Sequence, residues 1–466
     1  MTGTSIYIKS LVIKNLRTFG DNVTIDFFDK NKVFPKWNLI LGENGIGKST
    51  VLQCIAWMKP KPPDLESEGK KIKMNDIEPY ITNEENETLL NLVRKSPKGD
   101  HLSTIVATFV AEKKLAEQDT TDKTAFCRTS IKIGLDTKGK LSEVTTTFRT
   151  NSKEIFYPNE VLIYAYSASR VLGKLNLSDK QLDDTIPGFI AEQTILLDAQ
   201  EILHTANYAK LGSKKTERAK YKRFLTKVQE MLVSLLPDFT STKDLEIITP
   251  KILDKRLESG RILATTRHGK KIPFSNFSLG YKTVMSWAVD LAWRMLTQYT
   301  NSPNPLAEPA IVIIDELDLH LHPQWQVGIM KNLSKHFPNV QFIATAHSPL
   351  MVQEAANANY SVLKQINEDV CVLTKPTDIQ GWRVDQILTS ELFDLPSARG
   401  PEYNNLMRKR NALAHKLKLT RAEKIRLTHL NEAINKYPSG STPEDIENNK
   451  LITDILAKYK TNKSVH

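Results

Sequence analysis

The chain has 466 residues, of which 40% are hydrophobic, 8% aromatic and 25% charged. This composition is typical of a soluble globular protein with one large core or two moderate ones. Lys and Arg number 64 against 53 Asp and Glu, so the net charge of +11 makes an acidic partner such as nucleic acid plausible without demonstrating one. No run approaches the roughly 18 apolar residues of a membrane span, and the N-terminus lacks a basic region followed by a long apolar run, which argues against integral-membrane and secreted proteins.

The three cysteines are far apart. Cys54, Cys127 and Cys371 form no CxxC pair, so they provide neither a zinc site nor a disulfide framework. This usage indicates a reducing compartment, and we expect the protein to be cytoplasmic.

The first part of the chain has the pattern of strands around one loop and helix. Alternating apolar residues over 5–28 predict two strands, and WNLIL at 37–41 predicts a third. The third runs directly into GENGIGKST, after which VLQCIAWM has helical spacing. The order strand, Gly-rich loop, helix is the one that a phosphate-binding loop requires.

The middle of the chain begins with a polar excursion at 59–98 and returns to strand-like runs, the last of which, EVLIYAYSA, ends next to Arg170. Residues 191–211 and 214–236 are helical in period, and in the second helix one apolar stripe stands out. The members of this stripe are Phe224, Val228, Met231, Leu232 and Leu235.

The second half alternates helices with buried strands. A strand-like IPFSNF precedes a long helix over 278–296, and the β-branched run PAIVIIDE is typical of a strand buried on both faces. A helix over 323–337 leads to a further buried strand, VQFIATAHS. Residues 401–466 are polar and helical in pattern, with 13 Lys and Arg against 7 Asp and Glu.

The loop from Gly42 to Ser49 matches GxxxxGK[ST]. Backbone N–H groups of such a loop, together with the helix N-terminus, can wrap a nucleotide phosphate. Lys48 would reach the β- and γ-phosphates, and the Ser49 hydroxyl would bind Mg²⁺. The candidate cofactors are therefore ATP and Mg²⁺, and the candidate binding residues in this loop are Asn44, Gly45, Gly47, Lys48, Ser49 and Thr50.

Two acidic residues follow the strand IVII. Asp315 would meet the magnesium through water at the carboxyl end of the strand, and Glu316 would polarise the attacking water as general base. An apolar run that ends in Asp-Glu is weak evidence by itself. Paired with the Gly-rich loop, it predicts an ATPase site.

Further motifs resemble those of ABC-type ATPases in the same chain order. Ser278-Leu279-Gly280-Tyr281-Lys282 resembles the signature sequence, Leu317-Asp318-Leu319 the D-loop, and His347 in IATAHS the switch histidine. The opening IKNLRTFG and the segment LHLHPQWQ resemble the branch that contains chromosome-maintenance, recombination-repair and overcoming-lysogenization ATPases. No glutamine closely follows EVLIYAYSASR, so the γ-phosphate sensor that the family's Q-loop supplies is not assigned to a residue; Gln193 and Gln200 are poorly placed for it.

The resemblance implies a fold and a mechanism. We expect an α/β, two-lobed ABC-type head over 1–395, with lobe I at about 1–170, a helical insertion at about 175–245 and lobe II at about 246–395, followed by a basic helical region over 396–466. ATP would be sandwiched in a head-to-tail dimer or a higher oligomer, between the loop of one chain and Ser278, Gly280, Lys282 and Asp318 of another. His347 would contact the γ-phosphate, and Arg17 would approach the adenine or ribose.

The short insertion and the tail GWRVDQILTSELFDLPSARGPE resemble the ATPase subunits of anti-phage defence systems, first those of Septu, then those of PARIS and of retrons. The resemblance implies an ATP-binding, slowly hydrolysing sensor subunit that assembles with a separately encoded nuclease and restrains it. The chain has no HNH, TOPRIM or deaminase pattern, so we expect the effector to be another protein.

Alternatives from other classes stay open. A DNA-repair or recombination ATPase would clamp DNA, and the basic helices at 214–227 and 408–426 could contact DNA or RNA phosphates or simply be solvated. Arg410 and His415 have the Arg-x4-His spacing of HEPN ribonucleases, which allows a self-contained ribonuclease, although a solvated basic helix explains the spacing better. A metal site of His320, His322 and His347 is a weaker hypothesis, and a transporter ATPase is the weakest.

Overall fold

A computed structural model gives the structure of the chain. It describes residues 5–20, 22–29, 33–61, 77–83, 86–94, 102–112, 125–136, 138–152, 161–175, 177, 184–212, 214–236, 238–248, 262–265, 269–355, 358–374, 379, 381–395, 397–416 and 418–437. Their contacts divide the chain into two compact units, of which the first comprises Met1–Ile387 with Glu391–Phe393 and the second Leu388–Ser390 with Asp394–His466.

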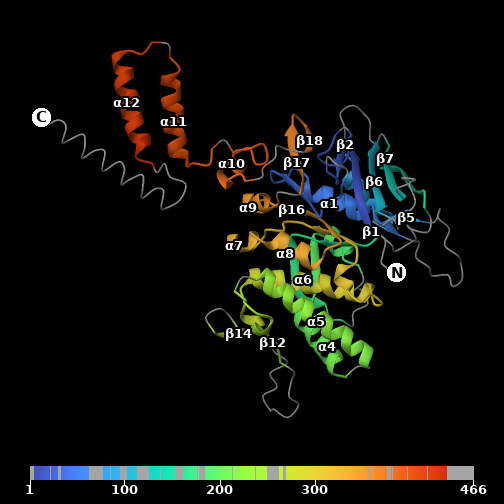
Figure 1. Ribbon diagram of the computed structural model, residues 1–466. Coiled ribbons are helices and arrows are strands. Elements are labelled where there is room, and N and C mark those ends of the chain that lie inside the picture. Colours follow the sequence, from blue (N-terminus) through green and yellow to red (C-terminus); the bar gives the residue numbers. More distant parts are fainter. Residues whose placement is uncertain are drawn as a thin grey trace, which may run out of the picture. The chain divides into compact units, whose positions relative to one another are not determined.

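A six-stranded sheet forms the centre of the first unit, in the order β18-β17-β3-β16-β15-β9. Figure 1 labels three of its strands, β16, β17 and β18. The strands β17, β3, β16, β15 and β9 pair in parallel, and β18 is antiparallel to β17. Their bounds are Trp37–Gly42 (β3), Ile163–Tyr166 (β9), Ala310–Ile314 (β15), Val340–Thr345 (β16), Asn359–Ile366 (β17) and Asp369–Thr374 (β18). In β15 and β16 every residue is buried, as the continuous apolar runs predict for strands covered on both faces.

Alternate residues of the central strands belong to two different hydrophobic cores. Ile311 and Ile313 of β15 pack into the core that contains α1 (Lys48–Trp57). Val312 and Ile314 pack into the core on the opposite face, which several helices cover. The two-residue period of side chains in a strand thus divides the first unit into two layers, one on either side of the sheet.

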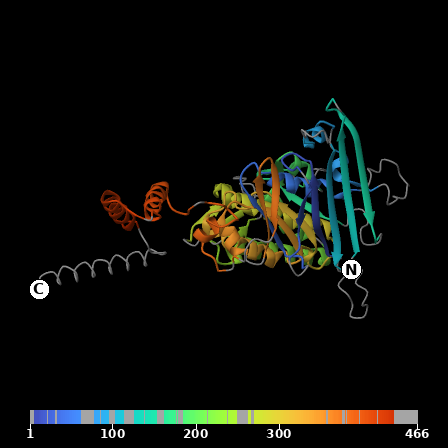
Figure 2. The same ribbon diagram turned by 90° about the horizontal axis from the view of Figure 1, so that it is seen from above.

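An antiparallel sheet makes up most of the first layer (Figure 2). Its strand order is β2-β1-β6-β7-β8, with the alternating residues of β1 buried on the side of α1. The bounds are Ser5–Lys14 (β1), Val23–Asp26 (β2), Leu102–Glu112 (β6), Ala125–Leu135 (β7) and Leu141–Thr150 (β8). The helix α2 (Asn86–Leu92) adds Leu89 and Leu92 to the same core.

Helices cover the other face of the central sheet (Figure 1). The predicted stripe on α5, from Phe224 to Leu235, is buried there, which confirms its assignment as the core face of that helix. The long helix predicted at 278–296 is α6. The bounds are Ala199–Gly212 (α4), Lys215–Leu235 (α5), Leu279–Gln298 (α6), Pro323–Gln326 (α7), Ile329–His336 (α8) and Pro349–Glu354 (α9).

Short elements complete the first unit. Two of them, β10 (Ser169–Leu175) and β11 (Gln193–Leu197), form a parallel pair directly after β9. The others are β4 (Pro60–Lys61), β5 (Glu78–Pro79), α3 (Ile186–Ile190), β12 (Leu245–Ile247), β13 (Ile262–Thr265) and β14 (Lys271–Pro273), with 3-10 turns at Tyr80–Asn83, Thr242–Asp244, Phe274–Asn276 and Pro305–Ala307. The helix α10 (Val384–Leu388) belongs to the first unit except for its last residue.

The helical expectation is wrong in two places. Residues 193–197 form the strand β11, because Thr194 and Ile195 pair with β10 while Leu196 and Leu197 are buried. The helix expected over 323–337 is broken into α7 and α8, because Gly328 adopts a φ of 101° and its N–H bonds to the carboxylate of Glu354. Glycine is the residue that tolerates this left-handed backbone without strain.

Within the described residues of the second unit, the helices are α11 (Pro401–Ala414) and α12 (Arg421–Asn435). Thr420 and Glu423 cap α12 reciprocally through a capping box, which stabilises its start. Tyr403 and Tyr437 pack edge to face with ring centroids 5.2 Å apart. We refer to these two helices as the α11–α12 hairpin.

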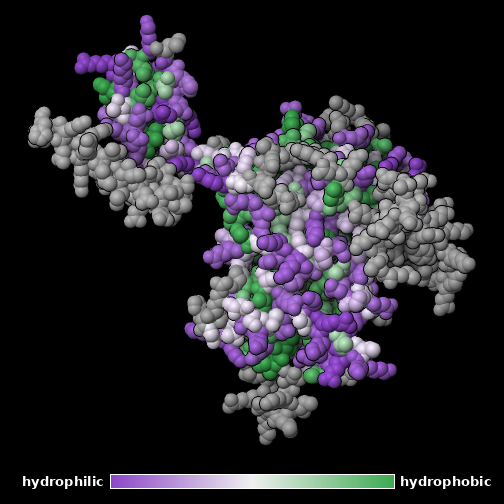
Figure 3. All heavy atoms as spheres, in the orientation of Figure 1, coloured by the Kyte–Doolittle hydropathy of each residue, from purple (hydrophilic) through white to green (hydrophobic). Residues whose placement is uncertain are grey.

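None of the described helices combines the length and the apolar composition that crossing a membrane would take. On the face shown in Figure 3, hydrophilic residues predominate and hydrophobic residues form separate patches.

Candidate nucleotide-binding site

The Gly-rich loop lies between the carboxyl end of β3 and the start of α1. Gly45 and Gly47 have φ values of 77° and 107°, which place both in the left-handed region. A Cβ on Gly47 would lie 2.8 Å from Oγ1 of Thr18 and 3.0 Å from the ring of Phe19. Position 47 therefore requires glycine for both backbone conformation and space, because the loop packs closely against Thr18 and Phe19.

Lys48 is the first residue of α1 and is 7% exposed. Its Nζ donates hydrogen bonds to the carbonyl oxygens of Gly42, at 2.9 Å, and Glu43, at 2.7 Å. Burial lowers the pKa of this ammonium group, and the nearby carboxylates of Asp315, Glu316 and Asp318 oppose that shift. The structure thus places the predicted phosphate-binding cation inside the loop, facing the predicted acidic residues.

Ser49, in the first turn of α1, lies next to Asp315, which directly follows β15. The Ser49 hydroxyl donates to Oδ2 of Asp315 at 2.7 Å, and the Thr345 hydroxyl donates to Oδ1 of the same carboxylate at 2.5 Å. Ser49 is exposed and Asp315 is 8% exposed, so one side of this group is open to solvent. A hydroxyl beside a carboxylate supplies the hard oxygen ligands that Mg²⁺ prefers, and the residues present fit that ion.

Glu316 follows Asp315 in a left-handed conformation with a φ of 49°. Its N–H donates to Oγ1 of Thr345 at 2.7 Å, and the next N–H, of Leu317, donates to the carbonyl oxygen of Thr345 at 2.9 Å. Thr345 therefore fixes the chain at the point where β15 ends. The half-buried carboxylate of Glu316 has no hydrogen-bond partner among the described residues, which leaves it available to a reacting group.

Arg170 is a site residue to which sequence reasoning gave no role. Its Nη2 donates to the carbonyl oxygen of Asp315 and, at 3.3 Å, to that of Glu316. Burial lowers the pKa of the guanidinium group to about 10, whereas Asp315, Glu316 and Asp318 act in the opposite direction. The available signal was its position directly after the buried run EVLIYAYSA, at the same edge of the sheet as the two acids.

Thr345 was missed as well. The threonine lies two residues before His347 in a strand that the sequence identifies as buried, and a buried hydroxyl needs a partner. That requirement could have pointed to the neighbouring strand end. The partner itself, Asp315, could be found only from the pairing of β15 with β16.

Asp318 and His347 are neighbours on the loops after β15 and β16. The backbone N–H of His347 donates to Oδ2 of Asp318 at 2.9 Å. Oδ1 of Asp318 is buried and has no hydrogen-bond partner among the described residues. His347 itself is exposed, so its imidazole is accessible from solvent beside the acidic residues.

The signature-like segment lies at the N-terminus of α6. Ser278 precedes the helix and is exposed, and the N–H of Lys282 bonds to the Ser278 carbonyl oxygen at 3.1 Å. A Cβ on Gly280 would lie 2.4 Å from the carbonyl oxygen of His320, so the helix touches the segment just beyond Asp318. This contact requires a residue without a side chain at position 280.

Arg17 lies beside the first turns of α1. Its Nη1 donates to Oγ1 of Thr50 at 3.2 Å and to Oε1 of Gln53 at 2.8 Å. Thr50 is 7% exposed, and its hydroxyl is engaged with Arg17 in this structure. Asn44 is exposed at the tip of the Gly-rich loop.

The weaker candidates stand apart from this group. Gln193 begins β11, and Gln200 lies in the first turn of α4. His322 caps α7 by accepting a hydrogen bond from Gln324, and no group of three metal-binding side chains occurs among the described residues. In the second unit, Arg410 bonds to Asn411 and Asn431, and no hydrogen bond joins it to His415 in the part of the hairpin that the structure describes.

Six of the predicted site residues lie together beyond the carboxyl ends of β3, β15 and β16. They are Lys48, Ser49, Asp315, Glu316, Asp318 and His347. Ligands of open parallel sheets bind beyond such strand ends, and a Gly-rich loop followed by a helix cradles phosphates. A loop of this kind after one strand, with two acids after another strand of the same sheet, defines a P-loop ATPase domain. The chain belongs to the family described as AAA ATPase domain, whose model matches residues 7–352.

Comparison with curated proteins confirms the expected resemblance to defence ATPases. The chain is 26% identical to the Septu protein PtuA of Bacillus mycoides over 99% of its own length and 55% of that protein's length. It is 29% identical to the probable ATPase of retron Vc95 of Vibrio cholerae, over 50% of this chain and 46% of that one. A Septu protein PtuA of Bacillus thuringiensis is 34% identical over 30% of this chain and 37% of its own. The chain thus spans about half the length, or less, of these relatives.

Among solved structures, the chain is similar to an SmcHead bound to the C-winged helix domain of ScpA. The TM-score is 0.43 at 16% identity, and the match covers 80% of this chain and 98% of the other. The SMC head domain from Thermotoga maritima gives a TM-score of 0.39 at 15% identity, over 79% and 99% of the two chains.

Proposed function

We propose that the chain binds ATP with Mg²⁺ and hydrolyses it slowly as the sensor subunit of an anti-phage defence complex. The ATPase part of the proposal rests on one observation. Beyond the carboxyl ends of β3 and β15, four residues lie close together: Lys48, Ser49, Asp315 and Glu316. A phosphate-binding cation, a hydroxyl and carboxylate suited to Mg²⁺ and a free carboxylate are together what ATP hydrolysis requires.

Each of these residues has a distinct role in the proposal. Lys48 and the backbone N–H groups of Gly45 and Gly47 balance the phosphate charge, and Ser49 and Asp315 hold the Mg²⁺. The ion supplies charge neutralisation at the β- and γ-phosphate oxygens. Glu316, whose carboxylate has no hydrogen-bond partner among the described residues, takes the proton of the attacking water as general base.

The same proposal includes a dimer that completes the site. Ser278 and Leu279 are exposed at the N-terminus of α6, where unpaired backbone N–H groups favour an anion. In a head-to-tail dimer this helix end would face the phosphates bound by Lys48 of the other chain, with Asp318 and His347 at the junction. Nucleotide binding would then stabilise association by mass action, and hydrolysis would release it.

The defence role rests on the similarity to the Septu protein PtuA of Bacillus mycoides over almost the whole chain and to the probable ATPase of retron Vc95 over half of it. We propose that the complex contains a separately encoded nuclease, which the ATP-bound assembly holds inactive. The α11–α12 hairpin, with exposed Arg408 and Lys409, is the part of the chain that we assign to this partner or to nucleic acid.

The decisive experiment is affinity purification of the chain expressed together with its neighbouring genes. Copurifying proteins are identified by mass, and nuclease activity is measured with and without ATP and Mg²⁺. A copurifying nuclease whose activity falls when ATP is added supports the proposal, and Lys48→Ala should abolish that inhibition.

Two other outcomes would replace the proposal. A lone dimer that binds DNA and hydrolyses ATP faster on it would identify a repair-type clamp. Ribonuclease activity of the chain alone that is lost in His415→Ala would identify a self-contained ribonuclease, with Arg410 as the phosphate-binding residue.

A further inference from the structure

The end of β9 and the start of β10 hold both backbone polar groups of Asp315. The N–H of Asp315 donates to the carbonyl oxygen of Tyr166 at 2.9 Å, and the carbonyl oxygen of Asp315 accepts from the guanidinium of Arg170. The same guanidinium bonds to the carbonyl oxygen of Glu316. The proposed metal ligand and the proposed base are thus held by two residues only four positions apart in sequence.

The turn at Glu316, whose carbonyl oxygen Arg170 binds, has an unfavourable backbone conformation. Glu316 is a non-glycine residue with a φ of 49°, and such a conformation costs free energy unless the surroundings fix it. Thr345 fixes the N–H side of this turn, and Arg170 fixes the carbonyl side. The direction of the Glu316 carboxylate therefore depends on where Arg170 lies.

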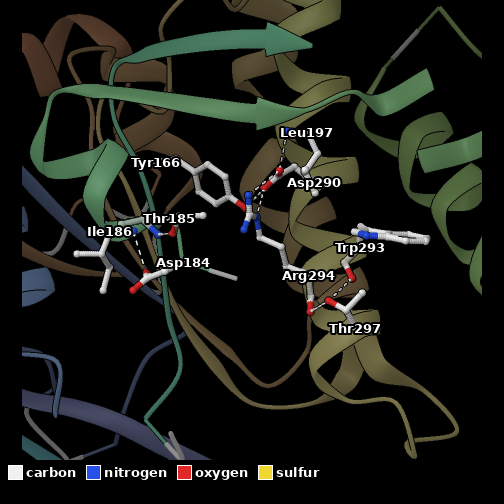
Figure 4. A network of polar contacts seen from close by, with 10 residues as sticks. Tyr166, Asp184, Thr185, Ile186, Leu197, Asp290, Trp293, Arg294 and Thr297 are labelled. Atoms are coloured by element: carbon white, nitrogen blue, oxygen red, sulfur yellow. Dashed lines mark hydrogen bonds and ion pairs between the residues drawn. The ribbon is translucent and has the colours of Figure 1, made fainter. Parts of the chain in front are cut away.

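Tyr166 connects this turn to α6 through a buried polar network (Figure 4). Its hydroxyl donates to Oδ2 of Asp290 at 2.8 Å, and Arg294 donates to the same carboxylate from Nε at 2.7 Å. Oδ1 of Asp290 accepts the backbone N–H of Leu197 at 3.0 Å. Asp290 is fully buried, so each of these donors compensates for the loss of water around its charge.

The network holds both strands that determine the position of Arg170. Arg170 lies in β10, directly after the turn that begins at Tyr166, and pairs with Thr194 of β11. Leu197 is the last residue of β11. Through Tyr166 and Leu197, Asp290 of α6 therefore anchors the strand before Arg170 and the strand beside it.

We propose that Arg170 is a positioning residue, which sets the Asp315–Glu316 turn for hydrolysis and transmits the position of α6 to it through the Tyr166–Asp290–Arg294 network. Arg170 lies at the end of the segment EVLIYAYSASR, which no glutamine closely follows. The inference rests on the proposed ATPase function and extends it: the helix that faces a second chain at its N-terminus controls the base through its buried side.

The first test separates nucleotide binding from turnover. Arg170→Ala should lower kcat for ATP at least about tenfold, which corresponds to a coupling of about 1.4 kcal/mol. KM for ATP and the dissociation constant for ADP without Mg²⁺ should change less than about threefold, since Lys48 and the loop are untouched. Arg170→Lys keeps a cation near the two carbonyls and should recover part of the lost kcat.

Arg149→Ala provides the matched control. Arg149 is exposed on β8 of the antiparallel sheet, and its removal should leave all three constants unchanged. If the wild-type protein hydrolyses ATP and the Arg170 variants keep its kcat, the inference is wrong. If Arg170→Lys loses ADP binding as well, Arg170 supports the nucleotide loop instead, and the inference is also wrong. A wild-type protein without ATPase activity would overturn the proposed function itself.

The second test addresses the link to α6. Tyr166→Phe removes only the donor to Asp290, because burial raises the pKa of the Tyr166 hydroxyl and keeps it protonated. Tyr360→Phe is the matched control, since Tyr360 is a buried tyrosine of the same sheet whose hydroxyl bonds to the end of α9. Both variants should show similar shifts of the melting temperature.

Turnover should distinguish the two tyrosines. Tyr166→Phe should lower kcat severalfold with KM unchanged, and Tyr360→Phe should not. The double variant Tyr166→Phe with Arg170→Lys should lose less than the product of the two single effects, because both changes act on the same turn. Multiplicative effects would show that the network and Arg170 act independently, which would overturn the proposed transmission.

Discussion

At the residue scale, the site depends on a few charged groups that the fold brings into contact. Lys48 is bonded to two carbonyl oxygens of its own loop, so its ammonium group is already oriented before any phosphate binds. Its position beside Asp315, Glu316 and Asp318 means that the lysine partly compensates an acidic edge. Removing it would leave that edge with excess negative charge, which repels phosphate.

Lys48→Ala should therefore weaken ATP binding by about 10- to 150-fold, the range for losing a hydrogen bond to a charged group. Titration of a fluorescent ATP analogue measures the dissociation constant. Lys132→Ala, on the exposed face of β7, serves as the control and should bind like the wild type. Unchanged affinity in Lys48→Ala would mean that the loop does not bind the phosphates.

Glu316→Gln tests the base. The amide keeps the shape of the side chain but cannot take a proton, so hydrolysis should fall at least about a hundredfold while ATP binding is retained. Phosphate release gives the rate, and light scattering after gel filtration shows whether ATP-bound dimers accumulate. Glu308→Gln, at the other end of β15, should hydrolyse ATP normally. Wild-type turnover in Glu316→Gln would show that another group is the base.

At the scale of elements, the parts of the fold that were most clearly predicted are the strands that are buried on both faces. Continuous apolar runs at β3, β15 and β16 indicate strands that are covered on both faces, and the Gly-rich loop predicted the helix after β3. The strand β11 was misread because its apolar residues merge with the helical spacing of α4. The position of Arg170 after a buried strand was visible in the sequence, but its role was not, because its partners are backbone carbonyl oxygens, which leave no trace in the sequence.

Gly280 illustrates a contact between elements that can be tested by stability. A Cβ at this position would approach the carbonyl oxygen of His320 to 2.4 Å, and backbone atoms cannot yield as a flexible side chain does. Gly280→Ala should therefore lower the free energy of unfolding by about 1–3 kcal/mol. Urea denaturation followed by tryptophan fluorescence measures the change.

Gly400→Ala is the control, because a Cβ there would meet nothing within 4 Å. It should leave the urea midpoint of the first unit unchanged. If Gly280→Ala is as stable as the wild type, α6 does not press against the segment after Asp318 as described.

At the scale of the whole molecule, the chain combines an ATPase unit with a second, basic unit. The 13 Lys and Arg among residues 401–466 exceed the 7 Asp and Glu there, and this excess accounts for more than half of the net charge of +11. Further exposed basic residues lie at the start of α5, where Lys214 precedes the helix and Lys215 is its first residue. Two separate groups of basic residues allow the partner-binding surface to be located by charge reversal.

We predict that Arg408→Glu with Lys409→Glu on α11 weakens association with the copurifying partner at least about tenfold, because like charges replace an electrostatic attraction across the contact. ATP hydrolysis should not change, since both residues belong to the second unit. Binding is measured by pull-down over a range of salt concentrations, and the wild-type complex should weaken as salt rises. Lys214→Glu with Lys215→Glu on α5 is the matched pair. If the Lys214 and Lys215 substitutions abolish association and the α11 substitutions do not, the partner binds the helical insertion at about 175–245. The assignment of the α11–α12 hairpin to the partner is then wrong.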